Sequence, residues 1–363
     1  IATNLSAGWI AARFGLTSTL YAGLGLQVIA LLALTQLDPE WAIGASVVFV
    51  MLVQGASGVA KDLAKMSSKS AVKLLAPAGH IGLFRWVALL TGSKNMVKGF
   101  GFLLGAALLA TIGFTGAVLG MATVLAVILI AVLILMPAGL PKGNPGAKFT
   151  EVFSMSPNVN WLSAARVVLF GARDVWFVVG IPIYFYAILS DGTEEGNRMS
   201  FFLIGTFMAI WVILYGLVQI NAPRILNAKS RTTAELISVT RLWAWALTLV
   251  PGVLAVAALL ANGPQHWLTL GLVLGLLLFG ALFAINSSLH SFLILLFTKA
   301  ERVTRDVGFY YMANAAGRLI GTLASGLTYH IGGLPLMLAI AAGMVALSAM
   351  AVSFLVPEEE TMG

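Results

Sequence analysis

Cysteine is absent from the 363-residue chain, which excludes disulfides, thiolate catalysis and any zinc site built on cysteine. Histidine is scarce, and its four occurrences are dispersed without the spacing of metal ligands: His80, His266, His290 and His330. We therefore predict that the protein has no metal site and no cofactor.

Charge is also scarce. Charged residues make up 10% of the chain, whereas ordinary globular proteins carry roughly 25%. Apolar residues make up 60% and the mean hydropathy is +0.97, so most of the surface must face lipid. The net charge of +7 does not indicate nucleic-acid binding, because the basic residues lie at the ends of apolar segments or singly within them.

Many apolar segments are long enough to cross the hydrocarbon core of a bilayer, which takes about 20 residues. They are too long for strands and lack alternation, and an open strand cannot span lipid. The opening IATNLSAGWIAA reads as the tail of one more membrane helix, so we expect the first helix and the start of the second to be missing. We predict an all-α integral membrane protein with spans near 17–36, 41–60, 82–111, 113–136, 159–188, 200–222, 238–261, 266–297, 307–329 and 334–356.

The connections between these segments alternate in charge. The positive-inside rule places the basic connections in the cytoplasm. We therefore expect a multi-pass protein of the inner (cytoplasmic) membrane whose central linker and C-terminus are cytoplasmic. The basic connections hold Arg13, Lys61 to Lys73, Lys142 and Lys148, Arg224 to Arg231, and Lys299 to Arg305, and the others are acidic on balance or uncharged.

One long polar interruption, rich in proline and glycine, covers 137–160. It separates five segments, the fragment included, from six, so one missing helix would give six plus six. This layout resembles the major facilitator superfamily, whose two halves are parallel repeats. We predict an N-terminal bundle at 1–136, a cytoplasmic linker at 137–158, a C-terminal bundle at 159–356 and a cytoplasmic tail at 357–363.

A weak internal repeat supports the two halves. MVKGFGFLLGAAL resembles MANAAGRLIGTLA, so that Gly101 and Gly105 recur as Gly317 and Gly321. Glycines four apart let another helix approach closely, and we predict a packing contact at each pair. Because this spacing is common in membrane helices, two unrelated packing faces would also explain the repeat.

Two partial motifs also resemble major facilitator proteins. GWIAARFGLTSTL matches the loop after their second helix at Gly8, Arg13 and Gly15, where we predict a conformational-switch loop. Ala12 stands where that loop has an acidic residue, and a generic glycine-rich loop would explain the match as well. GSKNMVKGFGFLLG, with glycines at 92, 101 and 105, weakly resembles the antiporter motif of exporters.

Cations lie inside the apolar segments. A charged side chain in the membrane centre costs about 2.5–3.5 kcal/mol even on insertion scales, so it is expected to face a cavity or a partner. Only Asp62, Asp174 and Asp306 lie in or beside the segments, so an anionic substrate is the natural missing charge. We predict substrate binding by Lys94, Lys98, Arg166, Arg173, Asn314 and Arg318.

The arginines carry most of this prediction, because a guanidinium group matches phosphate or carboxylate with two parallel hydrogen bonds. Arg166 and Arg173 are two helical turns apart, and Asp174 directly follows; a structural ion pair would absorb one arginine but not both. Asp174 and Asp62 are candidates for proton coupling. Lys69, by contrast, is interpreted with Lys73 as part of a solvated extension near lipid headgroups.

Four longer stretches carry a more specific resemblance: GASGVAKDLAKMSSKSAVKLL, LFRWVALLTGSKNMVKGFGFLLG, LSAARVVLFGARDVWFVVGIPIY and GTFMAIWVILYGLVQINAPRI. They resemble the ArsJ-type organoarsenical efflux permeases of the major facilitator superfamily. The resemblance implies antiport-type export of 1-arseno-3-phosphoglycerate, and thereby arsenate resistance. Glyceraldehyde-3-phosphate dehydrogenase would be a functional partner that supplies the substrate without forming a stable complex.

Other functions remain open. An organophosphate or sugar-phosphate transporter of the same superfamily would use the same cations. A membrane enzyme acting on phosphorylated lipids would need a metal-ligand cluster or a nucleophile–base pair, and the scattered histidines and aspartates lack such spacing. We expect a transporter and no enzyme.

Overall fold

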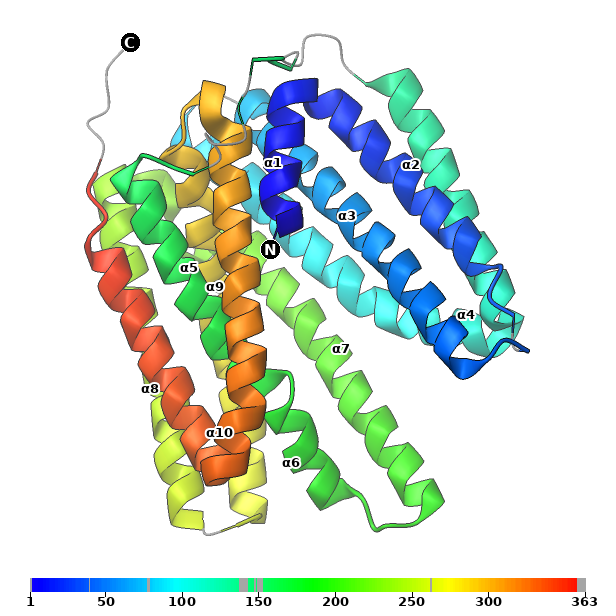
Figure 1. Cartoon of the computed structure of the whole chain (residues 1–363). Helices are drawn as coiled ribbons and strands as arrows, with labels where there is room; N and C mark the ends of the chain where they lie inside the picture. The colour runs from blue at the N-terminus through cyan, green and yellow to red at the C-terminus, as the bar shows by residue number, and fades with distance from the viewer. Residues whose placement is uncertain are drawn as a thin grey trace. The chain divides into compact units, whose positions relative to one another are not determined.

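The computed structural model describes residues 2–38, 40–76, 79–136, 143–146, 148, 153–261 and 263–357. Within these ranges the chain is almost entirely helical and contains no strand (Figure 1). Among the described residues, eight helical segments are long and apolar enough to cross a membrane. The all-α membrane fold expected from the sequence is therefore confirmed.

Ten α-helices and two short 3-10 helices make up the described chain. They are α1 (Ala2–Phe14), α2 (Leu16–Leu34), α3 (Ile43–Leu75), α4 (His80–Leu135), α5 (Pro157–Phe177), α6 (Gly180–Leu189), α7 (Glu194–Ile225), η2 (Ala228–Ser230), α8 (Thr233–Ala261), α9 (His266–Leu296), η3 (Ala300–Arg302) and α10 (Val303–Ser353).

Helices α4 and α10 each contain two of the predicted spans. The helical backbone is interrupted at Gly113 in α4 (φ 70°) and at Gly333 in α10 (φ 59°), where a positive φ favours glycine. The first half of α4 is not among the eight spanning segments, because Arg85, Lys94 and Lys98 interrupt its apolar sequence.

The predicted span 159–188 is not one continuous helix. Helix α5 ends at Phe177 and α6 begins at Gly180. Pro182 lies in the first turn of α6, where a backbone N–H has no partner within the helix and its absence costs nothing. If α5 continued through this position, the helix would lose a backbone hydrogen bond. Broken helices are tolerated at membrane depth where protein or a cavity surrounds them.

The chain divides into two compact units that interleave along the sequence. The first contains 1–76, 101–154 and 298–312, and the second contains 77–100, 155–297 and 313–363. Helices α4 and α10 therefore contribute to both. The contiguous bundles at 1–136 and 159–356 stay a prediction, and most of the linker and all of the tail after Pro357 lie outside the described residues.

In the first unit, α2 and α3 lie side by side (Figure 1). Gly23 makes this approach possible, since a Cβ there would lie only 2.9 Å from the Ala60 oxygen. Helix α1 packs on α3 and against the start of α10, where a Cβ on Gly8 would lie 2.8 Å from the Thr304 oxygen.

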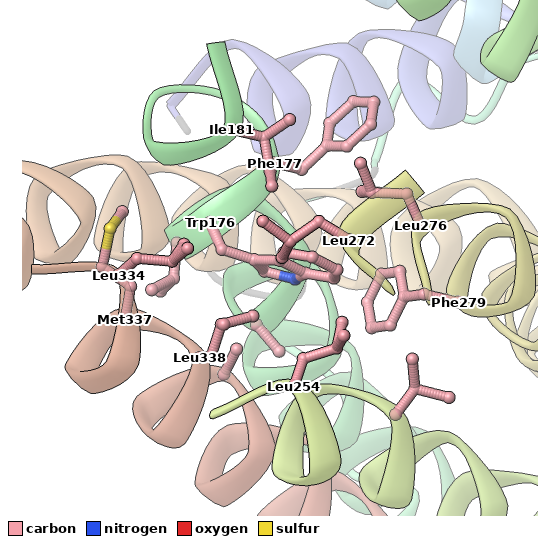
Figure 2. Packing of buried hydrophobic residues seen from close by; sticks show 14 of the residues in the cluster. Trp176, Phe177, Ile181, Leu254, Leu272, Leu276, Phe279, Leu334, Met337 and Leu338 are labelled. Atoms are coloured by element: carbon pink, nitrogen blue, oxygen red, sulfur yellow. The ribbon is translucent and has the colours of Figure 1, made fainter. Parts of the chain in front are cut away.

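The core of the second unit surrounds Trp176, which is fully buried. Around its indole lie Leu254 of α8, Leu272 of α9 and Leu338 of α10 (Figure 2). The Phe279 ring meets it edge-on, with 5.1 Å between the ring centroids. Truncating a buried side chain of this size costs about 3–5 kcal/mol. Trp176 follows the charged pair Arg173 and Asp174 by two residues, so its packing fixes the part of α5 that carries them.

Candidate functional site

Three of the predicted arginines come together in the second unit. Arg166 and Arg173 project from one face of α5, and both stack on Phe170, which lies between them in sequence. The guanidinium carbons lie 3.8 Å and 4.8 Å from the Phe170 ring centroid. The spacing of four and then three residues places all three side chains on one side of the helix.

Asp174 joins Arg173 to Arg318 of α10. Its Oδ1 accepts from Arg173, at 2.7 Å from Nε and 2.6 Å from Nη2. Its Oδ2 accepts from Arg318 Nε at 2.8 Å. The carboxylate is fully buried. The structural ion pair considered for Arg173 and Asp174 is thus present, and it includes a second arginine that the sequence did not indicate.

Arg166 is held mainly by uncharged groups. The residue is 4% exposed. Its Nε donates to Asn314 Oδ1 at 3.0 Å, and its Nη1 donates to the Ser287 hydroxyl at 3.1 Å. Asn314, predicted to bind substrate, therefore contacts the arginine and fixes the orientation of its planar donor group.

The charges of this cluster do not balance. Arg166, Arg173, Arg318 and Asp174 contribute three positive charges and one negative charge, which leaves two positive charges among the four side chains. The Arg318 side chain is 51% exposed and that of Arg173 16% exposed, so both can meet an incoming anion. The cluster is suited to binding a small molecule that carries more than one negative charge.

Glycines bring α10 close enough to α5 for these contacts. A Cβ on Gly317 would overlap the Val167 carbonyl oxygen, and one on Gly321 would overlap the Gly171 carbonyl oxygen. A step of four residues along α10, from Gly317 to Gly321, corresponds to a step of four residues along α5, from Val167 to Gly171. The two helices therefore run parallel here. Gly317 and Gly321 thus lie at a close helix contact, beside Arg318.

The predicted partner contact at Gly101 and Gly105 is not made by any described residue. Apart from the adjacent backbone of α4 itself, no described atom lies within 4 Å of a Cβ placed at either position. Instead, α4 presses on α7 through Gly92, where a Cβ would lie 2.6 Å from the Gly216 oxygen. Nine residues of helix amount to two and a half turns, so Gly101 points away from the face that Gly92 uses.

A series of buried and half-buried polar side chains leads from this α4–α7 contact toward Arg166. Asn95 Nδ2 donates to Gln219 Oε1 at 2.6 Å. Gln219 Nε2 donates to the Tyr215 hydroxyl at 3.1 Å, and Ser287 lies near that hydroxyl. Ser287 in turn accepts from Arg166. The sequence analysis did not predict this network. The only indication in the sequence is that the amides Asn95 and Gln219 each lie within an apolar segment.

A second polar cluster lies in the first unit, where Asp62 accepts from the Thr3 hydroxyl at 2.7 Å and from Lys65 Nζ at 3.0 Å. Lys65 Nζ lies 4.2 Å from the Tyr311 ring centroid and Lys69 Nζ 5.5 Å from it. Such distances allow cation–π attraction.

The interpretation of Lys69 as a solvated residue is therefore wrong. Only 3% of Lys69 is exposed, because α1 and the start of α10 cover this face of α3. A step of four residues along a helix identifies one face, but it does not tell whether water or protein meets that face.

The remaining predicted site residues are placed as follows. Lys94 and Lys98 lie one turn apart on α4 with exposed side chains, and their role in binding stays a prediction. Gly15 separates α1 from α2 with a φ of 90°. Arg13 stacks on the Trp9 ring at 5.5 Å. The predicted switch loop therefore forms a tight turn.

Comparison with solved structures identifies the fold. The chain matches a bacterial homologue of the iron transporter ferroportin in an outward-facing state, with a TM-score of 0.73 and 15% identity over 97% of this chain and 85% of that chain. It matches the fucose:proton symporter of E. coli with a TM-score of 0.70 and 13% identity, over 99% and 88% of the two chains.

A human organic anion transporter matches with a TM-score of 0.68 and 16% identity, over 97% of this chain and 82% of that one. The chain therefore has the major facilitator fold. Identities this low show a shared fold alone. No protein-family model and no curated protein matches the chain.

Proposed function

We propose that this chain, which has the major facilitator fold, is a secondary transporter that moves a small organic polyanion across the membrane by alternating access. The observation that carries the proposal is the cluster of Arg166, Arg173 and Arg318 around the single carboxylate of Asp174. A buried cation in a membrane protein is costly, and an anionic substrate would offset the charge that Asp174 leaves unbalanced.

Within this class, the proposed substrate is 1-arseno-3-phosphoglycerate, and the proposed direction is export from the cytoplasm. The support for both is the resemblance to ArsJ-type permeases. The substrate carries a phosphate at one end and an arsenate ester at the other, so its charge fits a site in which three arginines surround one carboxylate. The inner membrane and a cytoplasmic linker and C-terminus belong to the same proposal.

The proposed coupling step is an exchange at Asp174. A substrate oxyanion competes with the Asp174 carboxylate for Arg173 and Arg318, since all three groups meet within 3 Å. A carboxylate that loses both arginines takes up a proton more readily. Proton uptake by Asp174 would thus accompany anion binding and link the protonation of this carboxyl group to the transport cycle. Asp62 is the second candidate, because Lys65 holds it in a comparable ion pair.

Arsenate resistance tests the proposal directly. The full-length protein is produced in arsenic-sensitive cells with and without glyceraldehyde-3-phosphate dehydrogenase, and growth is followed in arsenate. We expect resistance only when both proteins are present, because the dehydrogenase supplies the substrate. Arg318→Ala should abolish resistance, whereas Arg198→Ala, which removes an exposed arginine at the start of α7, should retain it. Resistance that does not depend on the dehydrogenase would exclude this substrate.

The same cluster also favours an organophosphate or sugar phosphate as substrate. Uptake into proteoliposomes distinguishes the two: 3-phosphoglycerate or glucose 6-phosphate would be exchanged at a rate that depends on Arg318. Enzymatic action on phosphorylated lipids has no comparable support, since no three His, Asp or Glu side chains in the described part of the chain are placed to hold a metal ion.

A further inference from the structure

A cavity of about 680 Å³ lies between the start of α4 and the end of α7, apart from the arginine cluster. We propose that it binds the phosphate group of an anionic phospholipid from the membrane leaflet at this face. The residues that carry the argument are Arg85, Trp86, Leu89, Arg224 and Lys229, all of which line the cavity. They belong to one compact unit.

The cavity is positively charged and has no acidic counterpart. Arg85, Arg224 and Lys229 all contribute to its wall, and the chain segments that form it, 79–100 and 220–230, contain no Asp or Glu. In the described part of the chain, none of the three forms an ion pair with a carboxylate. Three exposed cations around one hollow attract the headgroup of an anionic phospholipid.

Backbone donors add to this charge. Ile81 and Gly82 line the cavity and lie in the first turn of α4, where N–H groups have no partner within the helix. The positive end of the helix dipole lies there as well. A phosphate in the cavity would therefore meet both side-chain cations and backbone donors.

The wall also has an apolar part suited to an acyl chain. Trp86 is 50% exposed, and Leu89 lies one turn further along α4 with a similar exposure. Tryptophan is enriched at the level of the lipid headgroups, and one helical turn leads about 5 Å deeper into the membrane. This order, with Arg85 first and Leu89 last, matches a phospholipid with its headgroup at the interface.

Local structure holds the cavity open. Helix α7 ends at Ile225, and Asn227 adopts a left-handed backbone (φ 47°) that turns the chain into η2. This turn places Arg224 and Lys229 on the same cavity. His80 Nε2 lies 3.2 Å from the Arg231 oxygen, which ties the start of α4 to the residues after the turn. The backbone that carries Arg85, Arg224 and Lys229 is thus held in place by these contacts.

Lipid binding tests the proposal. The purified protein is placed in nanodiscs of phosphatidylcholine with increasing brominated phosphatidylglycerol, and tryptophan quenching is compared with that of Trp86→Phe. We expect quenching of Trp86 at low phosphatidylglycerol fractions and a higher Tm than in phosphatidylcholine alone. Each basic residue near an anionic surface contributes about fivefold to affinity, so R85Q/R224Q/K229Q should weaken binding about a hundredfold.

Arg198→Gln, at an exposed position outside the cavity, is the matched control and should bind phosphatidylglycerol like the wild type. If the triple variant fails to fold, Lys229→Glu alone on the exposed turn must weaken binding at least about fivefold. Equal binding of phosphatidylcholine, or unchanged binding by these variants, would overturn the proposal. Displacement of the lipid by millimolar inorganic phosphate would identify free phosphate as the ligand instead.

Discussion

Arg318 on α10 donates to Asp174 on α5 across 2.8 Å from Nε to Oδ2, although 144 residues separate the two in sequence. The arginine is half-exposed while the carboxylate is fully buried. An anion can therefore approach the arginine without first displacing protein, whereas the carboxylate would meet it only through the arginine. This asymmetry makes Asp174 the residue through which substrate binding would be sensed.

Asp174→Asn keeps the shape of the side chain but cannot take up a proton. We expect substrate binding to remain measurable, because Arg173 and Arg318 are still present, while transport no longer responds to an imposed pH gradient. Exchange in proteoliposomes with and without the gradient measures this. Transport that still follows the gradient fully would exclude Asp174 as the coupling residue and leave Asp62, which Asp62→Asn tests in the same assay.

Lysine at position 318 keeps the positive charge but loses the planar donor group. A hydrogen bond to a charged group is worth roughly 1.5–3 kcal/mol, so Arg318→Lys should raise the Kd for the anion roughly 10- to 100-fold. Arg173→Lys should have the same effect, since two of its nitrogens contact Asp174. Titration calorimetry measures the Kd, and near-normal binding would reduce the arginines to a purely electrostatic role.

The two glycine pairs should respond in opposite directions to alanine. Gly317→Ala places a methyl group on the Val167 carbonyl, and such overpacking costs roughly 1–3 kcal/mol. Gly101→Ala meets open space and should stabilise the helix by roughly 0.5–1 kcal/mol. Thermal unfolding in detergent therefore should show a lower Tm for the first variant and an equal or higher Tm for the second. A similar fall in both would mean that Gly101 has a partner.

The polar network should support anion binding from a distance. Gln219→Leu removes the bridge between Asn95 and Tyr215 and leaves the half-buried amide of Asn95 without this partner, which costs about 1 kcal/mol. If the network orients Arg166 through Ser287, the Kd for the anion rises several-fold with a cost of this size. Gln27→Leu removes a comparable pair with Ser57 and should leave the Kd unchanged. An equal Kd in both variants would show that Gln219 does not help to position Arg166.

The sequence predicted most of the helices because crossing a bilayer demands long apolar segments, and length is visible in one sequence. It also placed the boundary between the spans 82–111 and 113–136 next to Gly113, where the structure interrupts α4. The break between α5 and α6 left a signal in the GIP sequence at Gly180, but apolar residues on both sides concealed it. Hydropathy reports burial in lipid or protein, and it does not report continuity of the backbone.

The site was predicted only in part, for a different reason. Arg166 and Arg173 could be paired because they share a helix, whereas the contact of Asp174 with Arg318 depends on which helices pack together. A single sequence does not show which helix packs on which face. For this reason the contact was predicted at Gly101, whereas the structure makes it at Gly92. Spacing along a helix defines its faces, and only the packed structure assigns each face a partner.

The parallel contact between α5 and α10 also constrains how this protein can diverge. Gly317 and Gly321 admit no larger side chain, and Asn314 and Arg318 share their face of α10, so we expect Asn-x-x-Gly-Arg-x-x-Gly to be retained as a unit. Its counterpart on α5 is Arg-x6-Arg-Asp. Homologues that keep the anion site should retain both patterns together, and those that lose one should have lost the other.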